Sequence, residues 1–288
     1  MGTLYIVATP IGNLKDITFR AIQTLQTVDI IAAEDTRHTG KLLEHFQIKT
    51  PQISYHEHNR VERLPELLSI LEEGKSIALV TDAGMPGISD PGYELVKATI
   101  EAGKTVIPIP GVTAVITALS ASGLPTDRFI FEGFLPTSSQ ERQNRLEFLA
   151  GESRTLIFYE SPHHLRQTLQ DFANSFGAYR RIVLGRELTK LYEEFWRGTI
   201  KDAIAYYQEK EPKGEFTLVV AGEVSGAPIL SEDTLKEELM AIMLQGVSRS
   251  QASRQLAQLT KISRRQLYQL ALSLPAPSQM VVESLSEN

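Results

Sequence analysis

Residues 3–123 alternate between short apolar runs and segments in which apolar residues recur every three to four positions. The runs have the length of buried strands, and the segments between them have the period of amphipathic helices. Strands joined by helices pair in parallel, and the helices then cover both faces of the sheet. This alternation predicts an α/β lobe with a parallel sheet. Its predicted strands are residues 3–8, 29–33, 51–56, 76–81 and 105–109.

The first helix of this lobe is expected to begin after Asp16, whose side chain is of the type that caps helix N-termini. Phe19, Ile22 and Leu25 follow at a spacing that places them on one face. That face is predicted to pack on the sheet.

Two further regions follow. The strand-like runs in the second region lie closer together and partly as hairpins, which predicts a mixed sheet in a second α/β lobe. The last region begins at a Gly-Ala-Pro break and reads as helical throughout. Ser248 and Ser263 are expected to cap two short helices there, joined by a turn as in a helix-turn-helix. The predicted domains are residues 1–123, 124–226 and 227–288.

The charge is unevenly distributed along the chain. The formal net charge is −6, yet no acidic residue lies between Glu238 and Glu283. A basic, acid-free segment on an acidic protein is typical of a local contact with a polyanion. The alternative is a helical cap whose basic residues are merely solvated. The predicted nucleic-acid contacts are Arg249, Arg254, Lys261, Arg264 and Arg265.

Several functional classes are excluded by missing features. The chain has no cysteine, so it has no disulfide, thiolate metal site or cysteine nucleophile. It has no phosphate-binding P-loop, no G-x-G-x-x-G fingerprint of nicotinamide oxidoreductases and no G-x-S-x-G nucleophile elbow. No apolar run reaches the roughly 18–20 residues that span a bilayer, and the start lacks the features of a secretory signal. A cytoplasmic protein without membrane association is expected.

The most informative motif is TDAGMPGISDPG, at residues 81–92. An ordinary surface turn would explain its glycines and prolines, but not its two aspartates directly after a strand. Ligands of parallel α/β sheets bind at the carboxyl ends of the strands, where this motif lies. His56 and His58 also follow a strand, but a pair without a third ligand is weak support for a metal, and none is predicted. The other strand-end segments are residues 10–13, 34–37 and 110–113.

Six motifs together resemble the tetrapyrrole methylase superfamily, and within it the branch that methylates RNA of the small ribosomal subunit. They are TPIGNL, AEDTR, TDAGMPGISDPG, PGVTA, FYESPH and the final helix-turn-helix, in that order over nearly the whole chain. The resemblance implies a two-lobed α/β fold in which the second lobe closes the cleft that holds the cofactor, S-adenosylmethionine. It further implies a homodimer. It also implies methyl transfer to the ribose 2′-hydroxyl of a cytidine in the decoding region of 16S rRNA, with the small ribosomal subunit as partner.

The resemblance also implies the cofactor contacts. The superfamily usually carries Gly-Asp-Pro in the central motif, whereas here Met85 precedes Pro86. Asp82 is therefore the carboxylate expected to face the cofactor. The implied cofactor-binding residues are Pro10, Asp82, Ala83, Gly84, Ile88, Thr113, Ala114 and Tyr159.

The catalytic residues are less constrained, because the resemblance does not settle which group acts. A ribose hydroxyl is a poor nucleophile at neutral pH, so a positioned base would help. Asp35, His58 and Glu160 are the candidate bases. Arg37 and Arg186 are candidates to hold a phosphate or the developing alkoxide.

Two other functions stay open at this point. A methyltransferase acting on a tetrapyrrole-like small molecule predicts a large apolar cavity and gives the basic tail no purpose. A non-enzymatic regulator that senses a metabolite predicts effector-dependent binding to nucleic acid without turnover.

Overall fold

The computed structural model describes residues 2–223, 231–260 and 262–275 of the 288-residue chain. They form two compact units. The first unit comprises Met1–Gly123, Gly185–Phe195 and Glu215–Thr217, and the second comprises Leu124–Leu184, Trp196–Gly214 and Leu218–Asn288. None of the described helices is long and apolar enough to span a bilayer.

The first unit contains the predicted parallel sheet. Its strand order is β3-β2-β4-β1-β5, and all four neighbouring pairs are parallel. The five predicted strands are confirmed, with ends that differ from the prediction by at most two residues. The strands are β1 (Thr3–Val7), β2 (Ile30–Ala33), β3 (Gln52–Ser54), β4 (Ser76–Val80) and β5 (Thr105–Ile109).

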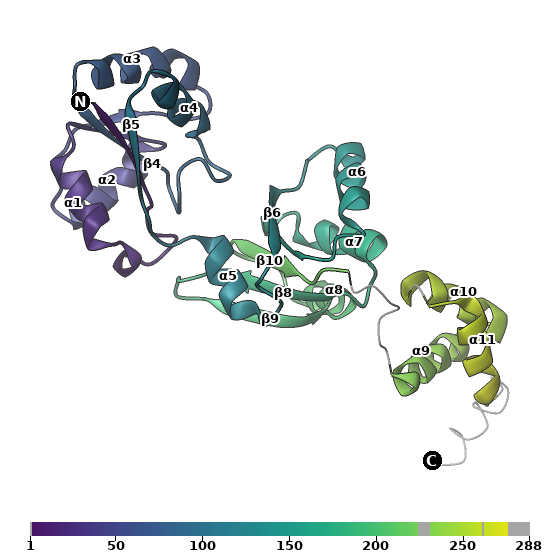
Figure 1. The fold of residues 1–288 in the computed structure, drawn as a ribbon. Helices are drawn as coiled ribbons and strands as arrows, with labels where there is room; N and C mark the ends of the chain where they lie inside the picture. Colours follow the sequence, from purple (N-terminus) through teal and green to yellow (C-terminus); the bar gives the residue numbers. More distant parts are fainter. Residues whose placement is uncertain (1, 224–230, 261, 276–288) are drawn as a thin grey trace. The chain divides into compact units, whose positions relative to one another are not determined.

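Helices cover both faces of this sheet, as predicted (Figure 1). Successive residues of a strand point to opposite faces. Val7 and Val80 accordingly lie in a core cluster with α1, whereas Ile6 and Leu79 lie in a second cluster with α3 and α4. The helices are α1 (Phe19–Thr27), α2 (Thr36–His45), α3 (Arg60–Glu72), α4 (Tyr93–Glu101) and α5 (Ala114–Ser122).

The predicted start of the first helix is wrong. Asp16 belongs to a short 3-10 turn, η1 (Leu14–Asp16), and Thr18 is the N-cap of α1 because its hydroxyl accepts the N–H of Ala21. Leu25 is fully buried and Ile22 packs on the same core cluster, as predicted, but Phe19 at the first position of α1 is 94% exposed. Threonine and aspartate are both favourable N-cap residues, so side-chain type alone does not distinguish Thr18 from Asp16.

The second sheet has the order β6-β7-β10-β8-β9, and β6 pairs with β7 in parallel. Only residues 187–193 join the neighbouring strands β8 and β9, too few for a parallel crossover, so this pair is antiparallel and the sheet is mixed, as predicted. The strands are β6 (Phe129–Phe134), β7 (Thr155–Glu160), β8 (Arg181–Arg186), β9 (Glu194–Thr199) and β10 (Phe216–Val220). The helices are α6 (Ser139–Leu149), α7 (Leu165–Phe176) and α8 (Ile200–Glu209).

The last described segment is the helical tail, formed by α9 (Glu232–Leu244), α10 (Arg249–Thr260) and α11 (Arg264–Ser273). Leu239, Leu256 and Leu267 are fully buried in its small core, which confirms the helical prediction. Ser263 caps α11 as expected, because its hydroxyl accepts the N–H of Gln266. The predicted boundary at residues 226/227 lies outside the described residues, and the division into three domains stays a prediction.

Candidate functional site

Two predicted ligand loops are joined by hydrogen bonds at the carboxyl edge of the first sheet. The first loop (residues 8–13) follows β1, and the central loop (residues 81–92) follows the neighbouring strand β4. Thr9 and Gly84 exchange two backbone hydrogen bonds of 2.9 and 3.1 Å. The Thr9 hydroxyl also donates to the carbonyl oxygen of Thr81 at 3.0 Å. The two loops therefore have a fixed relative position.

A glycine brings a third loop, between β5 and α5, against the first. A Cβ at Gly111 would lie 2.7 Å from the Ala8 Cβ, closer than two carbon atoms pack. Thr113, a predicted cofactor contact, is the N-cap of α5, and its hydroxyl accepts a backbone N–H of the first turn at 3.4 Å. Ala114 follows as the first residue of α5. Small residues therefore open α5 directly after β5.

The central loop is tightly folded. Gly84, Gly87 and Gly92 have φ angles of 81°, 80° and 147°, a region that other residues rarely adopt. A Cβ at Gly92 would approach the Gly87 nitrogen and the Leu79 side chain to 3.0 Å. Ser89, with φ of 61°, adopts a left-handed conformation without being glycine. Such backbone strain persists where the surroundings fix it, and it is frequent at ligand sites.

The predicted cofactor contacts in these three loops range from buried to exposed. Asp82 is half-buried between the two extremes. Buried and exposed groups side by side are what a ligand-lined edge requires. Pro10 and Gly84 are buried, Thr113 and Ala114 are half-buried, and Ala83 and Ile88 are exposed.

Three carboxylates gather at this edge, and we call Glu34, Asp82 and Asp90 the acidic cluster. The Asp82 N–H donates to a Glu34 carboxylate oxygen at 3.2 Å. Burial raises the pKa of Glu34, and the charge of Asp82 adds to the effect. Burial, followed by the charges of Glu34 and Asp82, raises the pKa of Asp90 to about 7. Glu34 and Asp90 were not among the predicted site residues, although both lie in motifs that were.

Asp35 and Arg37 form an ion pair with each other. Asp35 is the N-cap of α2, and it accepts two guanidinium hydrogen bonds of 3.0 and 2.7 Å from Arg37. These bonds and the Arg37 N–H hold the pKa of Asp35 well below its usual range. A carboxylate of such low basicity is a poor proton acceptor at neutral pH. The Arg37 side chain is 89% exposed, so its guanidinium is held in place at the surface.

His58 lies close to His56 but in a different environment. Their ring centroids are 6.0 Å apart, His58 is exposed, and the Nδ1 atom of His56 is buried without a hydrogen-bond partner among the described residues. The charge of His56 lowers the pKa of Glu34, so His56 faces the acidic cluster. Within residues 2–223, 231–260 and 262–275, no group of three metal-ligating side chains is arranged to hold a metal.

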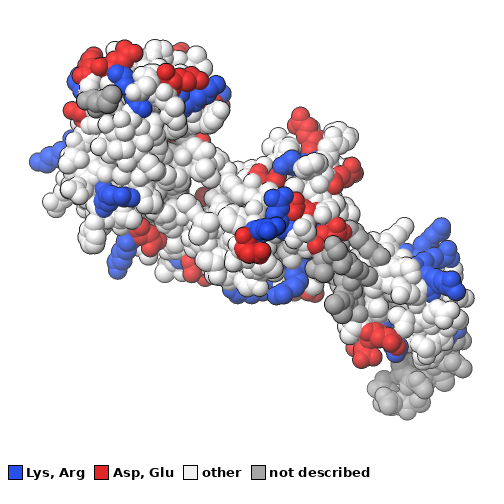
Figure 2. All heavy atoms as spheres, in the orientation of Figure 1, with Lys and Arg blue, Asp and Glu red and all other residues white. Residues whose placement is uncertain are grey.

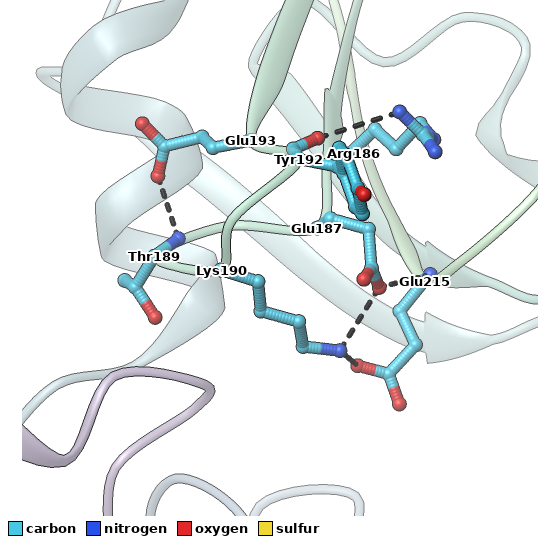
Figure 3. A network of polar contacts seen from close by, with 7 residues as sticks. All are labelled: Arg186, Glu187, Thr189, Lys190, Tyr192, Glu193 and Glu215. Carbon is cyan, nitrogen blue, oxygen red and sulfur yellow. Dashed lines mark hydrogen bonds and ion pairs between the residues drawn. The ribbon is translucent and has the colours of Figure 1, made fainter.

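Arg186 is the last residue of β8 and directly precedes the hairpin loop of residues 187–193, and both lie in the first unit (Figure 3). Its guanidinium donates to the Tyr192 carbonyl oxygen at 3.3 Å and lies 3.4 Å from a Glu194 carboxylate oxygen. Figure 3 also shows the Lys190 ammonium between two carboxylates, 2.9 Å from Glu187 and 2.7 Å from Glu215. These ion pairs hold the loop in a defined conformation.

This hairpin loop also packs against the first loop. A Cβ at Gly12 would lie 2.3 Å from the Lys190 side chain and 3.0 Å from the Thr189 hydroxyl. Glycine at position 12 therefore allows a close approach between segments far apart in the sequence. No local pattern in the sequence signals that approach.

Tyr159 and Glu160 end β7 in the second unit. The Tyr159 ring packs on Phe131, with ring centroids 4.9 Å apart. Glu160 is 5% exposed, and its two carboxylate oxygens accept the Ser161 N–H at 2.7 Å and the Thr168 hydroxyl. These contacts tie β7 to α7, which gives Glu160 a structural role within its own unit.

The predicted RNA-binding arginines fall into two groups. Arg249 donates to the Leu274 carbonyl oxygen at 2.6 Å and is partly buried, so it stabilises the tail. Arg264 donates to the Ser250 hydroxyl at 2.9 Å but stays exposed, as do Arg254 and Arg265. Lys261 lies outside the described residues.

The helical tail shows a separation of charge. Figure 2 shows Lys and Arg side chains gathered over the side formed by α10, whereas acidic side chains lie beside α9. Arg254, Arg264 and Arg265 come from α10 and α11, and the first turn of α9 carries Glu232 and Asp233. One side of the tail therefore offers exposed positive charge to a ligand.

Two family models match the chain. The model described as "Tetrapyrrole (Corrin/Porphyrin) Methylases" matches residues 3–204, and the model described as "RsmI C-terminal HTH domain" matches residues 232–275. The first match covers the first sheet and every strand of the second sheet except β10, and the second match covers the helical tail.

Curated relatives are similar over almost the whole chain. A protein from Synechocystis sp. named "Ribosomal RNA small subunit methyltransferase I" is 62% identical over 96% of this chain and 99% of its own length. A protein of the same name from Halalkalibacterium halodurans is 50% identical over 93% of this chain and 94% of its own.

Solved structures share the fold at lower identity. The structure titled uroporphyrin-III C-methyl transferase from Thermus thermophilus complexed with S-adenyl homocysteine covers 77% of this chain and 98% of its own. It has a TM-score of 0.56 and 15% sequence identity. At this identity the similarity concerns the fold alone.

Proposed function

The chain belongs to the tetrapyrrole methylases, in the branch of the ribosomal RNA small subunit methyltransferases I, and from this premise we propose its reaction. The protein transfers the methyl group of S-adenosylmethionine to ribosomal RNA. The acceptor is the ribose 2′-hydroxyl of a cytidine in the decoding region of 16S rRNA. The protein works as a cytoplasmic homodimer on the small ribosomal subunit.

One observation carries this proposal, namely that the similarity to the curated rRNA methyltransferases extends over both the α/β body and the helical tail. A tetrapyrrole methylase would share only the body. The tail carries the exposed arginines that a polyanionic substrate requires. The body and the tail together therefore favour RNA over a small-molecule acceptor.

The joined loops of the first unit fit the cofactor. Asp82 has a carboxylate oxygen, Oδ1, that is buried without a hydrogen-bond partner among the described residues, and a buried carboxylate requires a positive or donating partner. The cationic sulfonium of S-adenosylmethionine meets that requirement. The absence of a phosphate-binding glycine fingerprint suits a ligand without phosphates. We assign cofactor binding to Pro10, Asp82, Ala83, Gly84, Ile88, Thr113 and Ala114, with Tyr159 from the second unit.

The bound cofactor supplies an electrophilic methyl group, so the protein has mainly to position the ribose hydroxyl in line with it. Arg37 is suited to hold a phosphate next to the target nucleotide, because Asp35 fixes its exposed guanidinium. Asp35 itself acts through Arg37 and not as a base. His58 is exposed at the same edge and, unlike Asp35 and Glu160, is the candidate base whose side chain has neither a hydrogen bond nor an ion pair among the described residues.

Glu160 and Arg186 have supporting roles in this proposal. Both carboxylate oxygens of Glu160 already accept hydrogen bonds, so it orders the end of β7 next to Tyr159. Arg186 orders the hairpin loop of residues 187–193. Arg254, Arg264 and Arg265 contact the RNA backbone, Lys261 adds to the same charge, and Arg249 stabilises the helix pair that presents them.

The test is methyl transfer from labelled S-adenosylmethionine into small ribosomal subunits isolated from cells that lack the gene, followed by mapping of the labelled nucleotide. We expect label on one ribose, lost with Asp82→Ala and retained with Asp127→Asn, a substitution of an exposed aspartate in the second unit. Cofactor binding without labelled RNA would contradict the RNA substrate and direct the search to small-molecule acceptors. Effector-dependent binding to nucleic acid without turnover would instead support a regulator.

A further inference from the structure

The acidic cluster brings together carboxylates from two parts of the sequence. Glu34 directly follows β2, and Asp82 and Asp90 belong to the central loop after β4. Strands β2 and β4 are parallel neighbours, so their carboxyl ends lie side by side. The Asp82 N–H donates to Glu34, and Asp90 is close enough for both charges to act on it. The strand order therefore brings Glu34 beside Asp82, and the central loop adds the carboxyl group of Asp90.

No cation of the described chain forms an ion pair with these three carboxylates. Arg37 lies near Asp82, but its Nε and Nη2 atoms bind Asp35, and it forms no ion pair with the acidic cluster. His56 faces Glu34 and is the other titratable group next to the cluster. The negative charge is thus left without a matching positive charge.

Two buried polar atoms in the cluster lack hydrogen-bond partners within the described residues. One is Oδ1 of Asp82, and the other is the hydroxyl of Thr81, a residue that is only 1% exposed. The Thr81 hydroxyl lies beside Asp90 and lowers the pKa of that carboxyl, without reaching normal hydrogen-bond geometry. Buried polar groups are ordinarily satisfied, so this pair of atoms at the loop edge is available to bind a ligand.

Crowded, half-buried carboxylates cannot all ionise at neutral pH. Burial and the two neighbouring charges raise the pKa of Asp90 to about 7. At pH 7 the cluster therefore holds an extra proton for about half of the time. A cation bound beside the cluster would lower that pKa and expel the proton.

We propose that Glu34, Asp82 and Asp90 form a proton-exchanging counter-ion for the sulfonium of the cofactor. This inference rests on the proposed function. The acidic cluster gives up a proton when the positively charged cofactor binds, and it takes one up when methyl transfer removes that charge. S-adenosylhomocysteine, the product, has a neutral sulfur and lies beside a protonated cluster that attracts it less strongly. The cluster therefore favours the charged cofactor over its product.

The proton balance of the reaction agrees with this role. The O–H bond of the ribose hydroxyl breaks, the oxygen electron pair forms a bond to the methyl carbon, and the pair of the carbon–sulfur bond returns to sulfur. Sulfur becomes a neutral thioether, and one proton is released. Once the positive charge has gone, the acidic cluster regains its affinity for a proton and can hold the one released.

The test is calorimetric titration of the full-length protein at pH 7 in two buffers that differ in ionisation enthalpy, which gives the number of protons released on binding. The ligands are S-adenosylmethionine, sinefungin, which carries an ammonium at the position of the sulfonium, and S-adenosylhomocysteine, which is neutral there. The amino group of each ligand can also exchange protons, so the informative quantity is the difference between wild type and Asp90→Asn with the same ligand.

We expect wild type to release up to about half a proton more than Asp90→Asn with both cationic ligands, and no more than the variant with S-adenosylhomocysteine. The preference of wild type for S-adenosylmethionine over S-adenosylhomocysteine should fall roughly tenfold in the variant, the effect of one pKa unit. Glu34→Gln, which keeps an acceptor for the Asp82 N–H, should reduce the proton release as well. Asp127→Asn is the matched control and should leave both quantities unchanged.

Two results would overturn the inference. The first is that wild type and Asp90→Asn release equal numbers of protons with the cationic ligands. The second is that the difference between wild type and Asp90→Asn is as large with S-adenosylhomocysteine as with the cationic ligands. In both cases the ligands still bind, so the proposed function survives. If none of the three ligands binds to wild type, the proposed function itself fails.

Discussion

The acidic cluster at the carboxyl edge of the first sheet consists of three half-buried carboxyl groups close together. The basic groups of the helical tail are instead exposed and spread over two helices. The acidic cluster is held by a tightly folded loop that contains several residues with positive φ. The exposed arginines Arg254 and Arg265 project from regular helices with an apolar core of their own.

This difference in burial matches a difference in ligand. Charges in a half-buried site act strongly over short distances, so they select a compact ion and change their own protonation when it binds. Exposed charges are screened by salt, and each contributes little alone, but together they bind an extended polyanion. The comparison predicts that each region can be disabled without affecting the ligand of the other.

The largest effect is expected from Asp82→Asn. This substitution removes a carboxylate with a buried, unpartnered oxygen and leaves the side-chain volume nearly unchanged. Loss of one partner of a buried charge pair costs about 2–5 kcal/mol, so the Kd for S-adenosylmethionine should rise at least about 30-fold. Calorimetric titration measures this, with Asp127→Asn as control. An unchanged cofactor Kd would remove Asp82 from the site.

A roughly tenfold loss of affinity for RNA is expected from the double variant Arg254→Gln/Arg265→Gln. Each lost phosphate contact should reduce the slope of log K against log salt by about 0.7–0.9, and RNA affinity at moderate salt should fall roughly tenfold. Filter binding of small subunits over a salt series measures both quantities. Arg249→Gln is the informative comparison, because it should lower the Tm of the tail through the lost bond to Leu274 without a specific change in salt slope. Identical salt slopes for wild type and the double variant would show that the tail does not contact RNA.

A moderate and pH-dependent effect on stability is expected from Asp90→Asn. Burial raises the pKa of Asp90 from 3.8 to about 7 in the folded state, so the folded state binds this proton more tightly than the unfolded state. The stability contributed by the protonated carboxyl is therefore lost as the pH rises from about 4 to about 7. Asparagine does not ionise, so the Tm of the variant relative to wild type should increase by about 2–4 °C between pH 5 and pH 8.

Thermal unfolding of both proteins across this pH range checks the prediction, with Asp127→Asn as the reference for an exposed aspartate. A Tm difference that does not change with pH would show that Asp90 titrates normally. The proposed contrast between the crowded acidic cluster and the solvated arginines of the tail would then be contradicted.

The smallest effect is expected from Asp35→Asn. Asparagine also caps helix N-termini, so α2 should remain intact while Arg37 loses its ion-pair partner. If Asp35 only orients Arg37, methyl transfer should fall less than about fivefold, because exposed ion pairs contribute little. A general base typically contributes about 10²–10⁴-fold, so a loss of that size in kcat would identify Asp35 as the base instead.

The sequence predicted the positions of helices and strands better than it predicted which segments lie side by side in the fold. The strands were recognisable because each is a short apolar run between helical segments, and parallel pairing followed from the connections. The acidic cluster was not predicted, because Glu34 and Asp90 meet only through the strand order that places β2 beside β4. The approach of Lys190 to Gly12 likewise depends on long-range packing.

Residue roles within motifs were also hard to read from sequence. Asp35 and Glu160 carry the right chemistry for a base, yet one is bound to Arg37 and the other accepts hydrogen bonds at both oxygens. Asp16 and Thr18 are both suited to cap α1, and local packing selects Thr18. Side-chain type limits what a residue can do, whereas its partners in the fold determine what it does.

The most direct test of separate roles for the two charged regions is a steady-state methyl-transfer assay in which S-adenosylmethionine and small ribosomal subunits are varied in turn. We predict that Asp82→Asn raises the KM for S-adenosylmethionine alone, and that Arg254→Gln/Arg265→Gln raises the KM for the subunits alone. If either variant changes both constants to the same extent, the division between a cofactor-binding acidic edge and an RNA-binding basic tail is contradicted.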